Sequence, residues 1–281
     1  MGASEWISII RPLNCAMVGF AVIVGEFVSR PAQIPPIQTA LGFMTGFFIC
    51  AFSMAVNDVY DVEVDRVNQP GRPIPSGAVS VGGAARLSAL MLAAGVAASF
   101  LSLNAAAVAI ALAYAFLSWL YNSKAKREGI WGNVIVASSL AIPFVYGGVI
   151  SGGSIFSSLL LMMALTSFFA GVGREVVKAI ADVAGDEKRG VRSVALTKGS
   201  RAAALVGALF FLLAVATSWV PIILGMANII YTASVFLPDA IFVYLAISIV
   251  RRQDRENALA VKRRALIGML VGLFVFIGGA L

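Results

Sequence analysis

The sequence predicts an all-α, polytopic membrane protein in which nine transmembrane helices form one bundle with cytoplasmic cap loops or helices. Three observations support this prediction. The 281 residues are 60% hydrophobic and 12% charged, with a mean hydropathy of +0.92, whereas a soluble domain carries about 25% charged residues. Apolar stretches long enough to cross a bilayer recur along the whole chain. Almost all basic residues lie in every second connection between these stretches.

A spanning helix needs about 20 mostly apolar residues, and nine stretches reach or approach that length. They suit a single transmembrane domain over residues 1–281, and two polar segments, about 57–83 and 174–200, are expected to cap it. The nine predicted spans are 12–29, 37–56, 84–102, 104–122, 131–150, 154–173, 201–219, 229–250 and 265–281.

The basic residues predict the orientation of these helices. All of the 21 Lys and Arg residues except Arg30 fall before the first span or in the even-to-odd connections. Because Lys and Arg are retained in cytoplasmic loops, we expect a multi-pass cell-membrane protein with its N-terminus in the cytoplasm and its C-terminus outside. The pI of about 9.7 is then explained by topology and by attraction to membrane lipid. No nucleic-acid binding and no obligatory protein partner are predicted.

Missing and scarce residue types restrict the chemistry. The chain has no histidine, which excludes a Ser-His triad and ligation of zinc or haem by His. Its two cysteines, Cys15 and Cys50, both lie in apolar stretches and form no disulfide framework or zinc pattern. Any reaction therefore depends on carboxylates, amides and cationic side chains.

A first acidic cluster follows the second apolar stretch. Asn57, Asp61 and Asp65 are spaced four apart and share one face of a helix. Like charges at this spacing repel one another, and hard oxygen donors suit Mg²⁺. We therefore expect a divalent metal here, with Arg72 of the following Pro- and Gly-rich loop within reach of the acids. Pairing of each acid with a nearby Arg or Lys in a solvated loop is the alternative.

A second cluster follows the sixth apolar stretch. Asp182 and Asp186 again share a helical face, with Lys178 one turn earlier and Arg174 one turn before that. Two groups of carboxylates that face each other and are surrounded by cations suit a diphosphate leaving group that is bound through metal ions. An allylic carbocation left behind needs a dry apolar cavity. We expect aromatic residues to line it: Phe47, Phe48, Phe52, Phe116, Trp119, Tyr121, Phe168 and Phe169.

These motifs resemble the UbiA family of intramembrane prenyltransferases. The signature N-D-x-x-D-x-x-x-D matches Asn57, Asp58, Asp61 and Asp65; R-P-I matches Arg72-Pro73-Ile74; Y-x-x-K is similar to Tyr121 to Lys124; and the second acidic signature is similar to Asp182 and Asp186. The resemblance implies Mg²⁺-dependent transfer of a prenyl chain from its diphosphate to an acceptor. It implies that Asn57, Asp61, Asp65, Asp182 and Asp186 hold metal and diphosphate, with Lys178 in the catalytic set. Ala179 stands where many members carry another carboxylate, so the second metal site is expected to have fewer ligands.

Within the family, residues 11–17 and 173–178 are most similar to the archaeal branch that attaches the second geranylgeranyl chain of ether lipids. This implies transfer from geranylgeranyl diphosphate to geranylgeranylglyceryl phosphate, a lipid-like acceptor. Arg11, Asn14, Lys124 or Arg174 could bind the acceptor phosphate, and Asp58, Arg72 and Tyr121 complete the expected substrate-binding set. An aromatic acceptor of quinone synthesis stays open as an alternative. An ion-coupled transporter is the alternative of a different class, although the nearly uncharged outer loops do not favour it.

Asp239 is the remaining polar residue of interest, because an acid in the middle of the predicted span 229–250 costs about 2.5 to 3.5 kcal/mol on insertion scales. Either a structural role next to Pro238 or a place in the substrate cavity would account for it.

Overall fold

The computed structural model describes residues 3–29, 35–127, 130–153 and 157–280, and every regular element in them is helical. The twelve α-helices and one 3₁₀ turn are α1 (Ala3–Ile10), α2 (Pro12–Ser29), α3 (Pro36–Tyr60), α4 (Val62–Asn68), α5 (Val81–Leu101), α6 (Ala105–Ser123), η1 (Ala125–Arg127), α7 (Ile130–Ile150), α8 (Ser158–Arg189), α9 (Val194–Ile223), α10 (Ile229–Ser234), α11 (Phe236–Arg251) and α12 (Arg255–Ala280).

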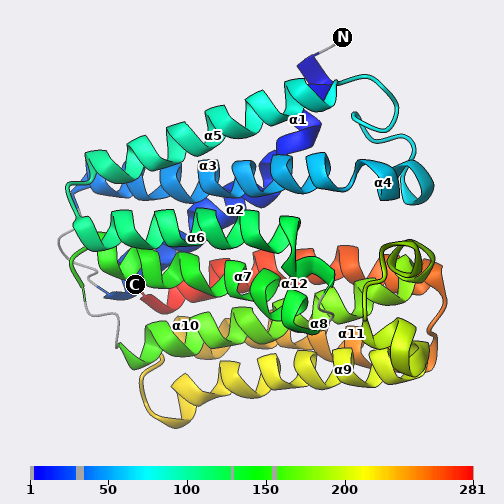
Figure 1. Cartoon of the computed structure of the whole chain (residues 1–281). Helices are drawn as coiled ribbons and strands as arrows, with labels where there is room; N and C mark the ends of the chain where they lie inside the picture. The colour runs from blue at the N-terminus through cyan, green and yellow to red at the C-terminus, as the bar shows by residue number, and fades with distance from the viewer. Residues whose placement is uncertain (1–2, 30–34, 128–129, 154–156, 281) are drawn as a thin grey trace.

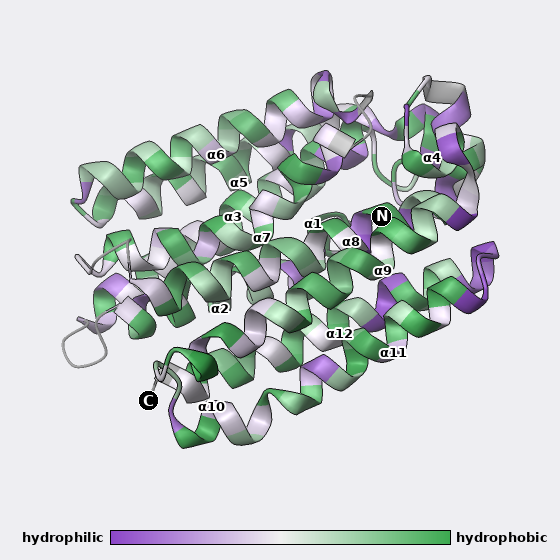
Figure 2. Ribbon diagram, turned by 90° about the horizontal axis from the view of Figure 1, so that it is seen from below, coloured by the Kyte–Doolittle hydropathy of each residue, from purple (hydrophilic) through white to green (hydrophobic). Residues whose placement is uncertain are grey.

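The long helices lie side by side in one bundle (Figure 1). Helix α3 packs against α5 and α2, α2 against α7, α7 against α8, and α8 against α9. Helix α12 contacts α2, α8, α10 and α11, so the C-terminal part of the chain packs on the first half of the bundle. Short α4 lies at the end of the bundle opposite the C-terminus (Figure 1). Hydrophilic residues are concentrated at that same end, whereas the long helices are mostly hydrophobic (Figure 2).

Close helix contacts depend on small residues, as in membrane proteins where packing takes the place of the hydrophobic effect. The clearest case joins α2 and α7. A Cβ at Gly25 would lie 2.1 Å from the Phe144 carbonyl oxygen, and one at Gly147 would lie 2.1 Å from that of Val22. The backbones therefore approach each other where only glycine fits.

Eight of the described helices are long and apolar enough to cross a membrane. They correspond to the first eight predicted spans, with α10 and α11 together forming the eighth. Residues 265–280 of the predicted ninth span, 265–281, form the C-terminal part of α12, which begins with a charged turn and is not among these eight. Residue 281 of this span and residues 154–156 of the sixth lie outside the described residues. The described residues thus support about eight candidate spans in an all-helical bundle.

The two predicted cap segments differ from each other. In 57–83, α3 ends at Tyr60, short α4 follows, and a turn-rich stretch leads to α5, whose N-cap Ser80 accepts a hydrogen bond from Gly83 N. In 174–200, by contrast, α8 continues without interruption to Arg189 and ends at Gly190 in the left-handed conformation, φ 64°. The second cap is thus mainly the extended end of a long helix, because Gly185 stays helical and Gly190 is the first glycine of this segment with a left-handed conformation.

Asp239 lies in the first turn of α11, since the predicted span 229–250 is interrupted between Ser234 and Phe236. Its carboxylate accepts hydrogen bonds from Ser218 Oγ at 3.0 Å and Trp219 Nε1 at 2.9 Å. These donors satisfy an acid that is buried against α9, as a structural role requires. Asp239 also lines the apolar cavity of the molecule, so both roles that the sequence left open stay predictions.

Candidate functional site

The first acidic cluster is built at the junction of α3 and α4. The i to i−4 hydrogen bonds continue through it, from Asp61 N to Asn57 O at 3.0 Å and from Asp65 N to Asp61 O at 2.8 Å. The predicted common face is therefore present. Asp58, Asp61 and Asp65 are nevertheless only 4%, 7% and 4% exposed, which is unusual for carboxylates. Burial of this kind requires partners of opposite charge.

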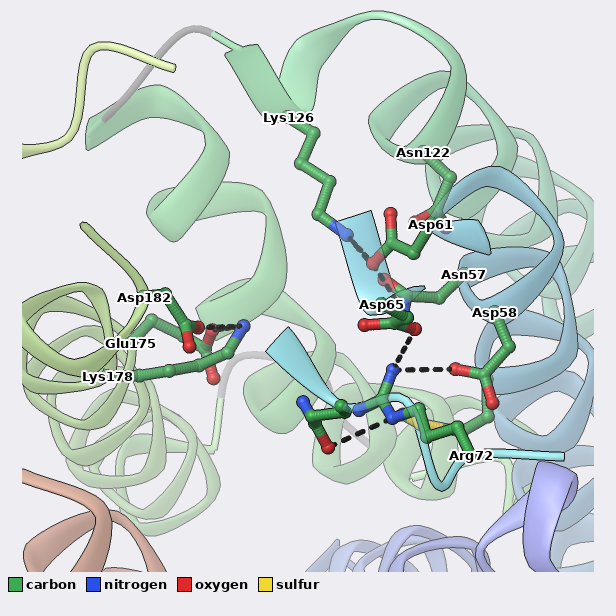
Figure 3. A network of polar contacts seen from close by, with 12 residues as sticks. Asn57, Asp58, Asp61, Asp65, Arg72, Asn122, Lys126, Glu175, Lys178 and Asp182 are labelled. Atoms are coloured by element: carbon green, nitrogen blue, oxygen red, sulfur yellow. Dashed lines mark hydrogen bonds and ion pairs between the residues drawn. The ribbon is translucent and has the colours of Figure 1, made fainter. Parts of the chain in front are cut away.

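Lys126 is the partner on one side of this cluster (Figure 3). Its Nζ donates to Asn57 Oδ1 at 2.8 Å and forms an ion pair with Asp61. Asn57 Nδ2 also donates to Asp61 Oδ2, at 3.0 Å. The 3₁₀ turn η1 after α6 brings Lys126 over the Tyr121 ring and towards the acids.

Arg72 is the partner on the other side. Its Nη1 lies 2.5 Å from Asp65 Oδ2 and 3.4 Å from Asp58 Oδ1 (Figure 3), and its Nε donates to Gln69 Oε1 at 3.0 Å. Asp58 also accepts from Arg11 Nη2, at 2.5 Å. Asp58 therefore holds two guanidinium groups in place.

The second cluster lies across the site on α8 (Figure 3). Lys178 Nζ is 3.8 Å from Asp182 and 3.5 Å from Glu175, and Arg174 Nη1 donates to Glu175 Oε1 at 2.6 Å. Glu175 was not among the residues predicted from the sequence. The sequence did contain one signal for Glu175, which is its position between Arg174 and Lys178. A buried acid at that position neutralises both cations.

Ala179 does not face this site. It is buried in an apolar cluster with Val176, Val177 and Ile180. A carboxylate at position 179 would enter that cluster in the present arrangement, so the residue lies outside the polar face formed by Asp182 and Asp186.

Lys262 reaches the same site from α12. Burial, followed by the positive charge of Lys178, lowers its pKa to about 8; Arg174 acts in the same direction, while Glu175 and Asp182 oppose it. The sequence indicated Lys262 only as a loop charge, because its proximity to α8 arises from packing between helices distant in the chain.

Both clusters line one polar cavity. Of the thirteen residues predicted for the site, eleven line it: Arg11, Asn14, Asn57, Asp61, Asp65, Arg72, Tyr121, Arg174, Lys178, Asp182 and Asp186. Lys126, Glu175 and Lys262 line it as well.

The other two predicted residues occupy different places. Lys124 is exposed and is not a lining residue; Lys126, two residues later, contacts the acids instead. In the structure, the turn at η1 places Lys126 rather than Lys124 next to the acids, and a substrate-binding role of Lys124 stays a prediction. Asp58 lies behind the cavity wall, where it contacts Arg11 and Arg72.

An apolar cavity adjoins the polar one. Asn14, Met54, Val136, Ser139 and Arg174 line both, so the two are continuous. The aromatic residues of the apolar cavity are Phe144, Phe242 and Phe276. Of the eight expected aromatic residues only Tyr121 lines either cavity, and Phe116 and Trp119 are exposed on the outside of α6. A hydrophobic sequence does not indicate which face of a helix points inward.

The side chains that line the cavity fit Mg²⁺, because they provide amide and carboxylate oxygens from two opposite walls and few metal ligands of other types. Asn57, Asp61 and Asp65 could hold metal from one wall, and Asp182 and Asp186 from the other. Among the described residues, no three acids or other metal-binding side chains converge on one point. Lys126 instead pairs with Asp61, Arg72 with Asp65 and Asp58, and Lys178 with Asp182 and Glu175. Cationic side chains therefore neutralise these acids in the structure.

Comparison with known proteins gives a consistent result. Residues 18–273 match the UbiA prenyltransferase family. The chain is 37% identical to the digeranylgeranylglyceryl phosphate synthase of Archaeoglobus fulgidus, covering 97% of this chain and 94% of that protein. It is 35% identical to that of Thermococcus kodakarensis, covering 98% and 96%.

Solved structures have the same fold. One of digeranylgeranylglyceryl phosphate synthase superimposes with a TM-score of 0.75 at 31% identity, covering 99% of this chain and 98% of the other. A UbiA homologue from Archaeoglobus fulgidus bound to GPP and Mg²⁺ superimposes with a TM-score of 0.69 at 17% identity, covering 97% and 99%.

Proposed function

The chain belongs to the UbiA prenyltransferase family, and from that premise we propose that it transfers a geranylgeranyl group from geranylgeranyl diphosphate to geranylgeranylglyceryl phosphate. The bond between the allylic carbon and the diphosphate oxygen breaks. An ether bond forms from that carbon to the free glycerol hydroxyl, whose proton is released with the diphosphate. The product carries the second ether bond of an archaeal membrane lipid. The observation that carries this proposal is the near full-length similarity to relatives with that activity in their name.

We propose that the two acidic clusters hold the diphosphate through Mg²⁺. Asn57, Asp61 and Asp65 bind from one wall of the polar cavity, and Asp182 and Asp186 bind from the other. When bound, Mg²⁺ neutralises the diphosphate oxygens as negative charge develops on them. Lys126, Arg72 and Lys178, which pair with these acids in the structure, would turn to the leaving diphosphate and stabilise it.

The apolar cavity supplies the environment for the reacting carbon. Apolar side chains exclude water from a cation-like carbon, and the rings of Phe144, Phe242 and Phe276 face the same space. No histidine is available as a strong base, so the hydroxyl loses its proton late, after the new bond has begun to form. Arg11, Asn14 and Tyr121 line the polar cavity and are proposed to contact the substrates.

We also propose the full topology. The apolar part of α12, packed against α2, α8 and α11, forms a ninth span. The distribution of Lys and Arg then places the N-terminus and the active site at the cytoplasmic face and the C-terminus outside. Cysteine labelling of single-cysteine variants from either side of sealed vesicles tests this orientation.

The activity is tested with purified protein in detergent, labelled geranylgeranyl diphosphate, Mg²⁺ and either geranylgeranylglyceryl phosphate or an aromatic acid. We expect an ether product with the lipid acceptor alone, and product only with the aromatic acid would refute the proposal. Asp61→Asn and Asp182→Asn should abolish turnover. Glu63→Gln is the matched control, because the side chain of Glu63 is 79% exposed and its one ion pair among the described residues is with Arg66, at 2.7 Å. Turnover in detergent, where no gradient exists, also excludes transport as the basis of activity.

A further inference from the structure

Lys262 differs from the other cations that line the polar cavity. Arg11, Arg72, Lys126, Arg174 and Lys178 each have an acid within 4.0 Å. Within the described part of the chain, Lys262 has no such partner. A partly buried ammonium without a counter-ion is unfavourable, and an anionic ligand would relieve that cost.

Arg174 offers a second unused donor close by. Its Nη1 is bound to Glu175, whereas its Nε is buried and has no hydrogen-bond partner among the described residues. Arg174 and Lys262 influence each other electrostatically. Two cationic donors therefore lie at the α8 and α12 side of the cavity, where Glu175 and Asp182 are the acids that offset Arg174, Lys178 and Lys262.

The position of these donors differs from that of the metal-binding acids. Arg174 precedes Asp182 by eight residues on the continuous helix α8, which corresponds to about 12 Å along its axis. Glu175 and Lys178 lie between the two side chains, since Arg174 pairs with Glu175, Glu175 with Lys178, and Lys178 with Asp182. Arg174 is also one of the residues that line the apolar cavity as well as the polar one. This position suits a ligand that has an anionic head and an apolar tail.

We infer that Lys262 and the guanidinium group of Arg174, which line the same cavity, form a separate subsite for the phosphate monoester of the prenyl acceptor, distinct from the diphosphate site. This inference rests on the proposed function for the identity of the acceptor. The subsite selects acceptors that bear a phosphate beside a single apolar chain, and it sets the position of the neighbouring hydroxyl. The sequence indicated Arg174 as a candidate for the acceptor phosphate but not Lys262, because Lys262 lies on the last helix, far from both acidic signatures.

The test compares Lys262→Gln with Arg263→Gln, a neighbour on α12 whose side chain is exposed, and with Lys262→Arg, which keeps the charge. At saturating geranylgeranyl diphosphate, Lys262→Gln should raise the KM for geranylgeranylglyceryl phosphate by roughly 10- to 100-fold, the range for one hydrogen bond to a charged group. The KM for geranylgeranyl diphosphate should stay within about threefold of the parent value. The dephosphorylated acceptor should be used equally by both proteins. Arg263→Gln should resemble the parent, and Lys262→Arg should restore most of the affinity.

Two results would overturn the inference. One is an equal rise in the KM for geranylgeranyl diphosphate, which would assign Lys262 to the diphosphate site. The other is an unchanged preference for the phosphorylated acceptor. If the parent protein makes no product from this acceptor, the proposed function fails on its own. Equilibrium binding of a radiolabelled single-chain alkyl phosphate, without Mg²⁺ or diphosphate, then decides the subsite: weaker binding by Lys262→Gln than by Arg263→Gln supports it, and equal binding refutes it.

Discussion

Replacing Lys126 with glutamine, and separately Lys124 with glutamine, tests the arrangement of the site most directly. The two substitutions remove the same charge two residues apart. Lys126 contacts Asn57 and Asp61, whereas Lys124 is exposed and does not line the cavity. The sequence motif favours Lys124 and the structure favours Lys126.

The expected size of the effect follows from burial. The side chains of Lys126 and Asp61 are 16% and 10% exposed, so the ion pair is largely removed from solvent. Breaking a fully buried pair costs about 3–5 kcal/mol, and discounting for the remaining exposure leaves roughly 1–3 kcal/mol of folding stability. Loss of one preorganised donor to a developing charge typically lowers kcat by about 10²- to 10³-fold. Lys124→Gln should change stability by less than about 0.5 kcal/mol, as surface substitutions usually do.

The assay is product formation from labelled geranylgeranyl diphosphate at saturating Mg²⁺ and acceptor, together with thermal unfolding of each purified variant. We expect kcat to fall about 100-fold in Lys126→Gln and to stay within about threefold of the parent in Lys124→Gln. The reasoning is refuted if Lys126→Gln keeps more than about a third of kcat, or if both variants lose activity equally.

Three further predictions concern other parts of the site. Asp58→Asn should lower stability by about 1–2 kcal/mol and kcat by about tenfold, because Arg11 and Arg72 lose a shared partner. The Mg²⁺ concentration that gives half-maximal activity should be the same in this variant as in the parent. An increase in that concentration would make Asp58 a metal ligand. Since burial lowers the pKa of Lys262 to about 8, the ammonium form is lost as pH rises through that value. The KM of the parent protein for geranylgeranylglyceryl phosphate should therefore rise between about pH 7 and 9. In Lys262→Arg, whose side chain stays charged, this KM should not change with pH. A rise in both proteins would exclude Lys262 as the cause. Gly272→Phe should fill the apolar cavity, because the nearest described atom to a Cβ at this position is Pro238 Cβ, at 4.0 Å. The variant should favour geranyl over geranylgeranyl diphosphate by at least about tenfold. Gly272→Ala is the control, and an unchanged ratio of the two rates would contradict the prediction.

The sequence alone determined the features that depend on local order. Helix formation in lipid follows from long apolar stretches, because every backbone polar group must be satisfied within the segment. The common face of Asn57, Asp61 and Asp65 follows from helical spacing, and so does that of Asp182 and Asp186. The acids of these two faces line the cavity for this reason, and they form the acidic part of the family signatures.

Only the tertiary structure decided which distant side chains complete the site. A 3₁₀ turn brings Lys126 to the acids in place of Lys124, and packing of α12 on α8 brings in Lys262. The orientation of each apolar helix also decided that Phe144, Phe242 and Phe276 line the apolar cavity. Spacing along the chain specifies neighbours one helical turn apart, whereas these contacts join segments separated by tens of residues and depend on how whole helices pack.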